Sequence, residues 1–282
     1  MKCAWKEYLD LLPLWMRSQV DKLGRERLQE LRLRINRPPE LILSDGSFFL
    51  ENMVSSADLQ YTVNSASQYS PWRMQSIADG YITAQGGHRL GICGEAAVVD
   101  GRINAMHQIT SICLRVARDF PGIAHKAAMI PGSILIIGSP GRGKTTLLRD
   151  LVRQKSNCEE GAVAVLDERR ELFPVSGDTI CFSPGLRTEV LSGCRKASAV
   201  ETLIRTMNPS WLAVDEITAD TDCQAIVQAA FCGVSILATA HSADLQDFMK
   251  RPVYKPLLEH KIFLNIILMH QNKSWTWERM NI

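Results

Sequence analysis

The sequence predicts an α/β protein in which a domain with a mostly parallel sheet, residues 123–282, follows a smaller α+β domain, residues 1–122. Two observations lead to this prediction. In the second part, apolar runs of strand length recur with helical segments between them, as in parallel sheets covered on both faces. In the first part, helical periodicity is mixed with short alternating runs, and Phe120-Pro-Gly122 separates the two patterns.

The first part begins with helices and continues mainly with strands. Apolar residues at helical spacing predict helices over residues 5–30, and strict alternation of apolar and polar residues predicts a strand at 31–35. The remaining predicted elements are a strand at 40–43, a helix over 57–74, a hairpin centred on Gly86-Gly87 and a hairpin centred on Asp100-Gly101.

The second part opens with a short predicted helix at 123–129. Its predicted strands share the continuous apolar character of strands buried on both faces, and they lie at 133–137, 162–166, 211–214 and 234–239. Near the C-terminal end, two further strands at 261–269 and 275–280 flank a polar turn, which predicts a closing antiparallel hairpin.

The composition is that of an ordinary globular protein. Hydrophobic residues make up 46% and charged residues 22%, and the net charge is +2. This charge and an aromatic content of 7% argue against a basic groove for nucleic acid, so no nucleic-acid partner is expected. No apolar stretch approaches the length of a membrane span. The 8 cysteines form no C-x-x-C pair, which argues against common zinc and redox motifs and favours a reducing cytoplasm.

Residues 138–145 fit the phosphate-binding pattern G-x-x-x-x-G-K-[ST], with an apolar strand before them and a helical segment after them. The glycines let backbone N–H groups turn toward a polyphosphate, and the helix N-terminus adds a positive potential. Lys144 is expected to reach the β- and γ-phosphates, and Thr145 to ligate Mg²⁺. With ATP and Mg²⁺ as ligands, the predicted nucleotide-binding residues are Gly138, Ser139, Pro140, Gly141, Arg142, Gly143, Lys144, Thr145 and Thr146.

Asp215 and Glu216 end the apolar strand that begins at Trp211. Ligands of open α/β sheets bind at the carboxyl ends of the strands, which is where these two carboxylates are expected. Asp215 is predicted to hold Mg²⁺ through water. Glu216 is predicted to orient and deprotonate the water that attacks the γ-phosphate. Hydrolysis of ATP, in addition to binding, is therefore expected.

A second acidic segment also follows a predicted strand. Asp167 and Glu168 come directly after the strand at 162–166, where acids can supplement the magnesium shell. Arg169 or Arg170 can pair with phosphate or with a neighbouring subunit. The simpler alternative is a charged loop held by local ion pairs.

Other candidates are single residues. His241 follows a predicted strand and is either a sensor of the γ-phosphate or a histidine that satisfies a core hydrogen bond. Thr239 is a weaker candidate of the same kind. Arg115, Arg118 and Arg187 are each candidates for an arginine finger, contributed in cis or by a neighbouring subunit, with a solvated arginine as the alternative.

The order and spacing of these motifs resemble the stage III sporulation protein AA family, a relative of the type II and type IV secretion ATPases within the RecA-like class of P-loop proteins. The resemblance covers nearly the whole chain. Besides the phosphate loop, the motifs that carry it are residues 31–38, 87–95, 111–118, 165–169, 187–194, 205–209, 214–217 and 239–241.

The resemblance implies a RecA-like motor domain after the N-terminal domain, in a hexameric ring with nucleotide between domains. It matches Asp167-Glu168 to an acidic box and Ala240-His241 to a histidine box, which gives Glu168 and His241 catalytic roles. Arg115 and Arg118 match N-terminal-domain arginines that approach the nucleotide.

The resemblance also implies a cellular setting. The protein would be cytoplasmic, on the mother-cell side of the membrane around the forespore. There it would energise a secretion or channel complex through an integral-membrane protein of the platform type. Two other functions stay open on the sequence: a RecA-like ATPase that depends on nucleic acid, and an ATP-bound scaffold with little turnover.

Overall fold

Two hydrophobic cores divide the chain into two compact units. One unit comprises Met1–Asp119 together with Pro174–Cys181, and the other comprises Phe120–Phe173 together with the residues from Phe182 onward. The segment 174–181, which the sequence prediction placed in the second domain, thus packs with the first unit. The computed structural model describes residues 1–68, 80–99, 102–158 and 161–280.

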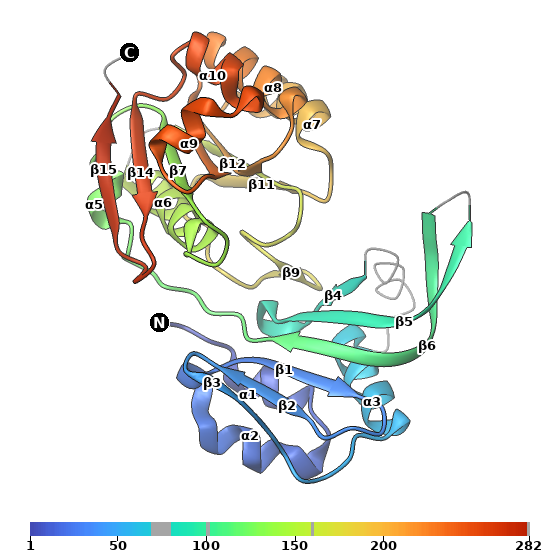
Figure 1. The fold of residues 1–282 in the computed structure, drawn as a ribbon. Helices are drawn as coiled ribbons and strands as arrows, with labels where there is room; N and C mark the ends of the chain where they lie inside the picture. Colours follow the sequence, from blue (N-terminus) through green and yellow to red (C-terminus); the bar gives the residue numbers. More distant parts are fainter. Residues whose placement is uncertain (69–79, 100–101, 159–160, 281–282) are drawn as a thin grey trace. The chain divides into compact units, whose positions relative to one another are not determined.

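The first unit contains a six-stranded antiparallel sheet (Figure 1). In spatial order its strands are β3 (Gly46–Phe49), β2 (Glu40–Leu43), β1 (Leu28–Arg34), β6 (Arg102–Arg115), β5 (Arg89–Val99) and β4 (Tyr81–Thr83). Its helical elements are α1 (Trp5–Asp10), α2 (Leu14–Arg27), α3 (Ser56–Ser67) and η2 (Gln85–Gly87). The segment 174–181 adds a two-stranded hairpin of β9 (Val175–Ser176) and β10 (Thr179–Ile180).

One face of this sheet packs on the helices. Leu31 and Leu33 of β1 are fully buried in the same core as Tyr8 of α1, whereas Arg32 between them is partly exposed. This alternation is the one that the sequence shows at 31–35, and it follows from the opposite directions of successive side chains in a strand.

The second unit is built on a seven-stranded sheet in which six strands are parallel (Figure 1). In spatial order the strands are β11 (Thr188–Ser192), β8 (Val163–Asp167), β12 (Trp211–Ile217), β13 (Ser235–His241), β7 (Ile134–Gly138), β14 (Asn265–Met269) and β15 (Trp275–Arg279). The last strand, β15, pairs with β14 antiparallel. The sequence prediction of a mostly parallel α/β sheet is confirmed.

Helices cover both faces of this sheet. Leu135 and Ile137 share a core with α7 (Lys196–Met207), α8 (Asp220–Phe231), α9 (Leu245–Lys250), η3 (Pro252–Tyr254) and α10 (Lys255–Glu259). The buried residues that alternate with them, Ile134 and Ile136, lie outside that core, on the opposite face. There α6 (Lys144–Cys158) contacts the sheet, and α5 (His125–Ala128) packs on α6.

Several element boundaries differ from the sequence prediction. The helical stretch expected to residue 30 ends at Arg27, after a break at Gly24 with φ +75°. The helix expected over 57–74 ends at Ser67, because Gln68 takes a left-handed conformation, and the remainder of that prediction lies outside the described residues. The two hairpins expected between residues 81 and 104 share one long strand, β5. The turn expected at residues 100–101 also lies outside the described residues.

Candidate active site

The phosphate loop connects β7 to α6, as the sequence predicts. Gly141 and Gly143 have φ values of +76° and +93°, in the left-handed region that glycine adopts without steric cost. Gly138 is packed tightly, since a Cβ there would lie 2.9 Å from Cβ of Met269. The loop therefore depends on its glycines, and it ends at the N-terminus of a 15-residue helix whose free N–H groups attract anions.

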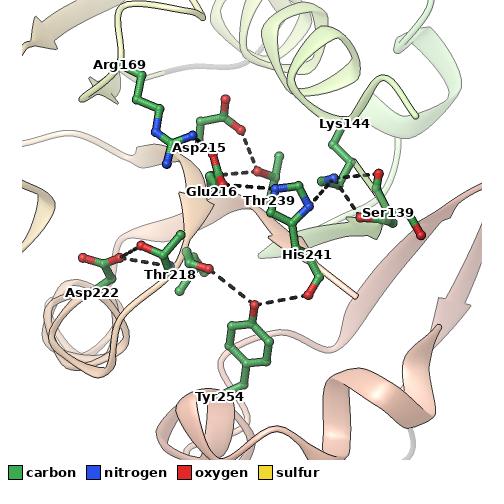
Figure 2. A network of polar contacts seen from close by, with 12 residues as sticks. Ser139, Lys144, Arg169, Asp215, Glu216, Thr218, Asp222, Thr239, His241 and Tyr254 are labelled. Carbon is green, nitrogen blue, oxygen red and sulfur yellow. Dashed lines mark hydrogen bonds and ion pairs between the residues drawn. The ribbon is translucent and has the colours of Figure 1, made fainter. Parts of the chain in front are cut away.

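Lys144 is buried under this loop, with an exposed fraction of 6%. Its Nζ donates to the carbonyl oxygens of Gly138 at 2.7 Å and Ser139 at 3.1 Å, and it lies 3.0 Å from Nδ1 of His241 (Figure 2). Burial lowers the pKa of Lys144, while the charges of Asp215 and Glu216 raise it. The Lys144 amine is thus held where the loop would receive phosphate oxygens.

Asp215 lies beside two hydroxyl groups. Thr239 Oγ1 donates to Asp215 Oδ1 at 2.6 Å, and the Thr145 side chain also hydrogen-bonds this carboxylate. Burial raises the pKa of Asp215, and the hydrogen bonds from Thr239 and Thr145 lower it. Mg²⁺ commonly takes one or two protein oxygens and completes its shell with water and phosphate. The adjacent oxygens of Thr145 and Asp215 fit that requirement.

Glu216 occupies an irregular position at the end of β12. Its φ of +56° is unusual for a residue with a side chain, and the pairing of β12 with β13 shifts register between Val214 and Ile217. The backbone N–H of Glu216 donates to Thr239 Oγ1 at 2.7 Å. This conformation turns consecutive carboxylates, Asp215 and Glu216, into the same site (Figure 2).

Each oxygen of the Glu216 carboxylate contacts a different basic side chain. Oε2 lies 2.6 Å from Nη1 of Arg169, and Oε1 lies 3.1 Å from Nε2 of His241. Because a lysine ammonium can only donate, Nδ1 of His241 accepts from Lys144, and the ring proton lies on Nε2, which donates to Glu216. Lys144, His241, Glu216 and Arg169 form one continuous chain of contacts (Figure 2).

The acidic segment after β8 has two separate roles. Asp167 is 1% exposed, and its carboxylate accepts the N–H groups of Glu171 at 2.8 Å and Phe173 at 2.9 Å, so it fixes the loop that follows. Burial raises the pKa of Asp167, and these backbone hydrogen bonds lower it. Glu168 forms an ion pair with the buried Lys196 at the start of α7.

The predicted arginines have partners within their own units. Arg115 Nε lies 3.0 Å from Glu30 Oε1, and Arg118 donates to the backbone carbonyl oxygens of Arg25 and Leu28. Arg187 precedes β11 and contacts Ser156. Arg187 precedes β11 whereas the phosphate loop follows β7, and these strands run parallel in one sheet. Arg187 therefore lies at the amino ends of the strands, away from the carboxyl ends that carry the phosphate loop. The prediction that it is an arginine finger in cis is wrong.

The sequence analysis expected Arg169 or Arg170 to pair with phosphate or with a neighbouring subunit, and it treated Thr239 as a weak candidate. The structure connects both directly to the strand-end acids. The contact of Arg169 with Glu216 could not be predicted from its position after a strand, because this contact depends on the conformation of the loop. Thr239 had the same alternation signal as the neighbouring buried residues, and only its hydroxyl distinguishes it.

The parallel sheet, the phosphate loop after β7 and the two acids near the carboxyl end of β12 define a P-loop protein of the RecA-like class. Its fold is shared with secretion and pilus ATPases. The pilus retraction motor PilT with bound ADP aligns with a TM-score of 0.64 over 96% of this chain and 84% of PilT, at 14% identity. The ATPase DotB of Legionella pneumophila aligns with a TM-score of 0.57 over 95% of this chain and 80% of DotB, at 15% identity.

The family model described as sporulation stage III, protein AA, matches residues 6–277, and the chain belongs to this family. Stage III sporulation protein AA of Bacillus subtilis (strain 168) is 34% identical over 272 residues, which cover 91% of this chain and 88% of that protein. Protein SEEDLING PLASTID DEVELOPMENT 1 of Arabidopsis thaliana is 25% identical over 89% of this chain, but this match spans 35% of the plant protein. Among the described residues, every helix is too short or too polar to cross a membrane.

Proposed function

We propose that this protein is an ATPase that hydrolyses ATP with Mg²⁺ at the carboxyl ends of β7, β12 and β13. The main support is the convergence of four groups from two separate parts of the sequence: the Lys144 ammonium and Thr145 hydroxyl, and the carboxylates of Asp215 and Glu216. A phosphate-binding loop alone would support nucleotide binding. The paired acids supply the metal contact and the base that hydrolysis also needs.

Each residue has a defined part in the proposed reaction. Lys144 and the loop N–H groups bind the β- and γ-phosphates, and Thr145 and Asp215 face the metal. When bound there, Mg²⁺ neutralises charge on the phosphate oxygens. Glu216 accepts a proton from the attacking water as its oxygen bonds to the γ-phosphorus. The bond from that phosphorus to the bridging oxygen breaks, and ADP leaves with this oxygen.

His241 is the proposed sensor of the γ-phosphate, because it bridges Lys144 and Glu216 and is therefore affected by any ligand that moves Lys144. Arg115 and Arg118 are proposed to complete the site from the first domain or from a neighbouring subunit. Glu168 is proposed to have a catalytic role as part of the acidic segment, next to Asp167 in the same loop.

Membership of the sporulation family and the fold shared with secretion ATPases support a cellular role. The proposed role is to energise a membrane-embedded secretion or channel complex during endospore formation. In this proposal the protein forms a hexameric ring, with residues 1–122 and 123–282 as its domains. It is cytoplasmic, on the mother-cell side, and reaches the membrane through an integral-membrane partner of the platform type.

The first test is nucleotide binding by the full chain. Wild-type protein is expected to bind a fluorescent ATP analogue in the presence of Mg²⁺ and to release phosphate from ATP, whereas Lys144→Ala loses binding. Mass photometry with a slowly hydrolysed analogue is expected to show six-subunit particles. Binding without any phosphate release would favour the scaffold, and release stimulated by single-stranded nucleic acid would favour the nucleic-acid ATPase.

A further inference from the structure

The Glu216 carboxylate is held from two sides by residues of different strands and loops. His241 comes from the end of β13, and Arg169 comes from the loop after β8. The contact to Arg169 is the shorter of the two, at 2.6 Å against 3.1 Å. A carboxylate that contacts donors at both oxygens has little freedom to rotate about its terminal bond. Arg169 therefore helps to determine which way the oxygens of Glu216 face.

The loop that carries Arg169 is itself fixed. On one side of it, the Asp167 carboxylate accepts two backbone N–H groups, from Glu171 and Phe173. On the other side, the buried Arg149 donates to the carbonyl oxygens of Leu172 at 2.6 Å and Glu171 at 2.7 Å. These bonds fix residues 171–173 relative to Asp167, and the backbone N–H of Arg170 donates to the Asp167 carbonyl oxygen at 3.1 Å, so the backbone on both sides of Arg169 is held.

Stability does not explain this ion pair. The Arg169 side chain is 56% exposed, and exposed ion pairs contribute little to folding. Its partner, however, is the residue proposed to deprotonate water, and that residue already has an unusual backbone conformation at φ +56°. Strained residues of this kind are commonly maintained where function requires a defined side-chain direction.

We propose that Arg169 is a positioning residue that holds the Glu216 carboxylate in the orientation needed to accept a proton from the attacking water. This inference rests on the proposed ATPase function. It also gives the acidic segment a function other than metal binding: Asp167 shapes the loop, and the loop presents Arg169 to the base.

The kinetic test compares two neighbouring arginines. Arg169→Ala is expected to lower kcat by about 10- to 100-fold and to leave KM within about twofold, since orientation of the base affects the chemical step. Arg169→Lys, which restores a positive charge, is expected to recover part of the loss. Arg170→Ala is the comparison, because it removes the same charge from the same exposed loop, and its kcat should fall less than that of Arg169→Ala.

A double variant separates positioning from a general effect on the fold. In a Glu216→Gln background the base is already absent, so adding Arg169→Ala is expected to cause no further loss of kcat. If the two substitutions lower kcat independently, so that their losses multiply in the double variant, the proposal is overturned. Equal losses in Arg169→Ala and Arg170→Ala would also overturn it, because they would show that only the charge of the loop matters.

A second readout needs no turnover. In nucleotide-free protein labelled with ¹⁵N-histidine, Arg169→Ala should shift the Nε2 resonance of His241, whose acceptor is the Glu216 carboxylate, and Arg170→Ala should not. The resonance is assigned with a His241→Gln variant. Unchanged resonances in Arg169→Ala would overturn the inference. A wild-type protein without phosphate release would instead overturn the proposed function, and the resonances would still decide whether Arg169 holds Glu216.

Discussion

Thr239 connects both strand-end acids, and its replacement by valine tests how much of the site depends on one hydroxyl. The Thr239 side chain is 1% exposed, and its Oγ1 donates to Asp215 and accepts from the Glu216 N–H. Valine has nearly the same shape, so Thr239→Val removes these two hydrogen bonds without leaving a cavity.

The cost follows from the two bonds. A hydrogen bond to a charged group contributes about 1.5–3 kcal/mol, and a buried N–H left without an acceptor costs about 1–3 kcal/mol. Because Thr145 still hydrogen-bonds Asp215, we expect a loss near the lower end of the sum, about 3 kcal/mol. For a unit of this size, that corresponds to a fall in melting temperature of roughly 6–12 °C.

Scanning calorimetry at neutral pH measures this change. Thr239→Ser, which keeps the hydroxyl and removes one methyl group, is the matched control and should lose about 1 kcal/mol. A Thr239→Val protein that melts within about 2 °C of Thr239→Ser would refute the reasoning, since it would mean that losing the hydroxyl costs no more than losing one methyl group.

Two further predictions concern other parts of the chain. Burial lowers the pKa of His88 from its ordinary value of 6.5 to about 4. The buried neutral ring therefore contributes about 3 kcal/mol to the free energy of unfolding above pH 6.5, and this contribution is lost as pH falls from 6.5 to 4. Denaturant unfolding at several pH values should show this loss in wild type and not in His88→Gln. If the free energy of unfolding falls equally with pH in both proteins, the prediction is contradicted. Gly138→Ala should cost about 1–3 kcal/mol and weaken ATP-analogue binding, because its Cβ would lie 2.9 Å from Met269 Cβ. The control Gly122→Ala has open space at Cβ and is strained only by its φ of +93°, so it should leave binding unchanged.

The second sheet was readable from the sequence because its strands are continuous apolar runs. Four predicted strands coincide closely with β7, β8, β12 and β13, and the closing hairpin corresponds to β14 and β15. The edge strand β11 was missed because Thr188–Ser192 mixes polar and apolar residues and is only partly buried. β11 pairs with β8 through backbone hydrogen bonds, and these do not require an apolar side-chain pattern from which the strand could be predicted.

The candidate site was predictable where a motif fixes local geometry. The phosphate loop and the strand-end acids needed only their position after apolar strands. The contact between Arg169 and Glu216 was not predictable, because it depends on a loop conformation that local hydrogen bonds to Asp167 and contacts from Arg149, 20 residues earlier, together hold. Segment 174–181 packs with the first unit for a similar reason, since its partners are set by tertiary contacts and not by its own composition.

The central claim is that Glu216 is the base of an ATP-hydrolysing site, and single-turnover phosphate release tests it most directly. Wild-type protein and Glu216→Gln are mixed in excess with ATP and Mg²⁺, and binding is measured in parallel. We expect Glu216→Gln to bind ATP within a few-fold of wild type and to release phosphate about 10²- to 10⁴-fold more slowly. Equal rates of release in the two proteins would contradict the assignment.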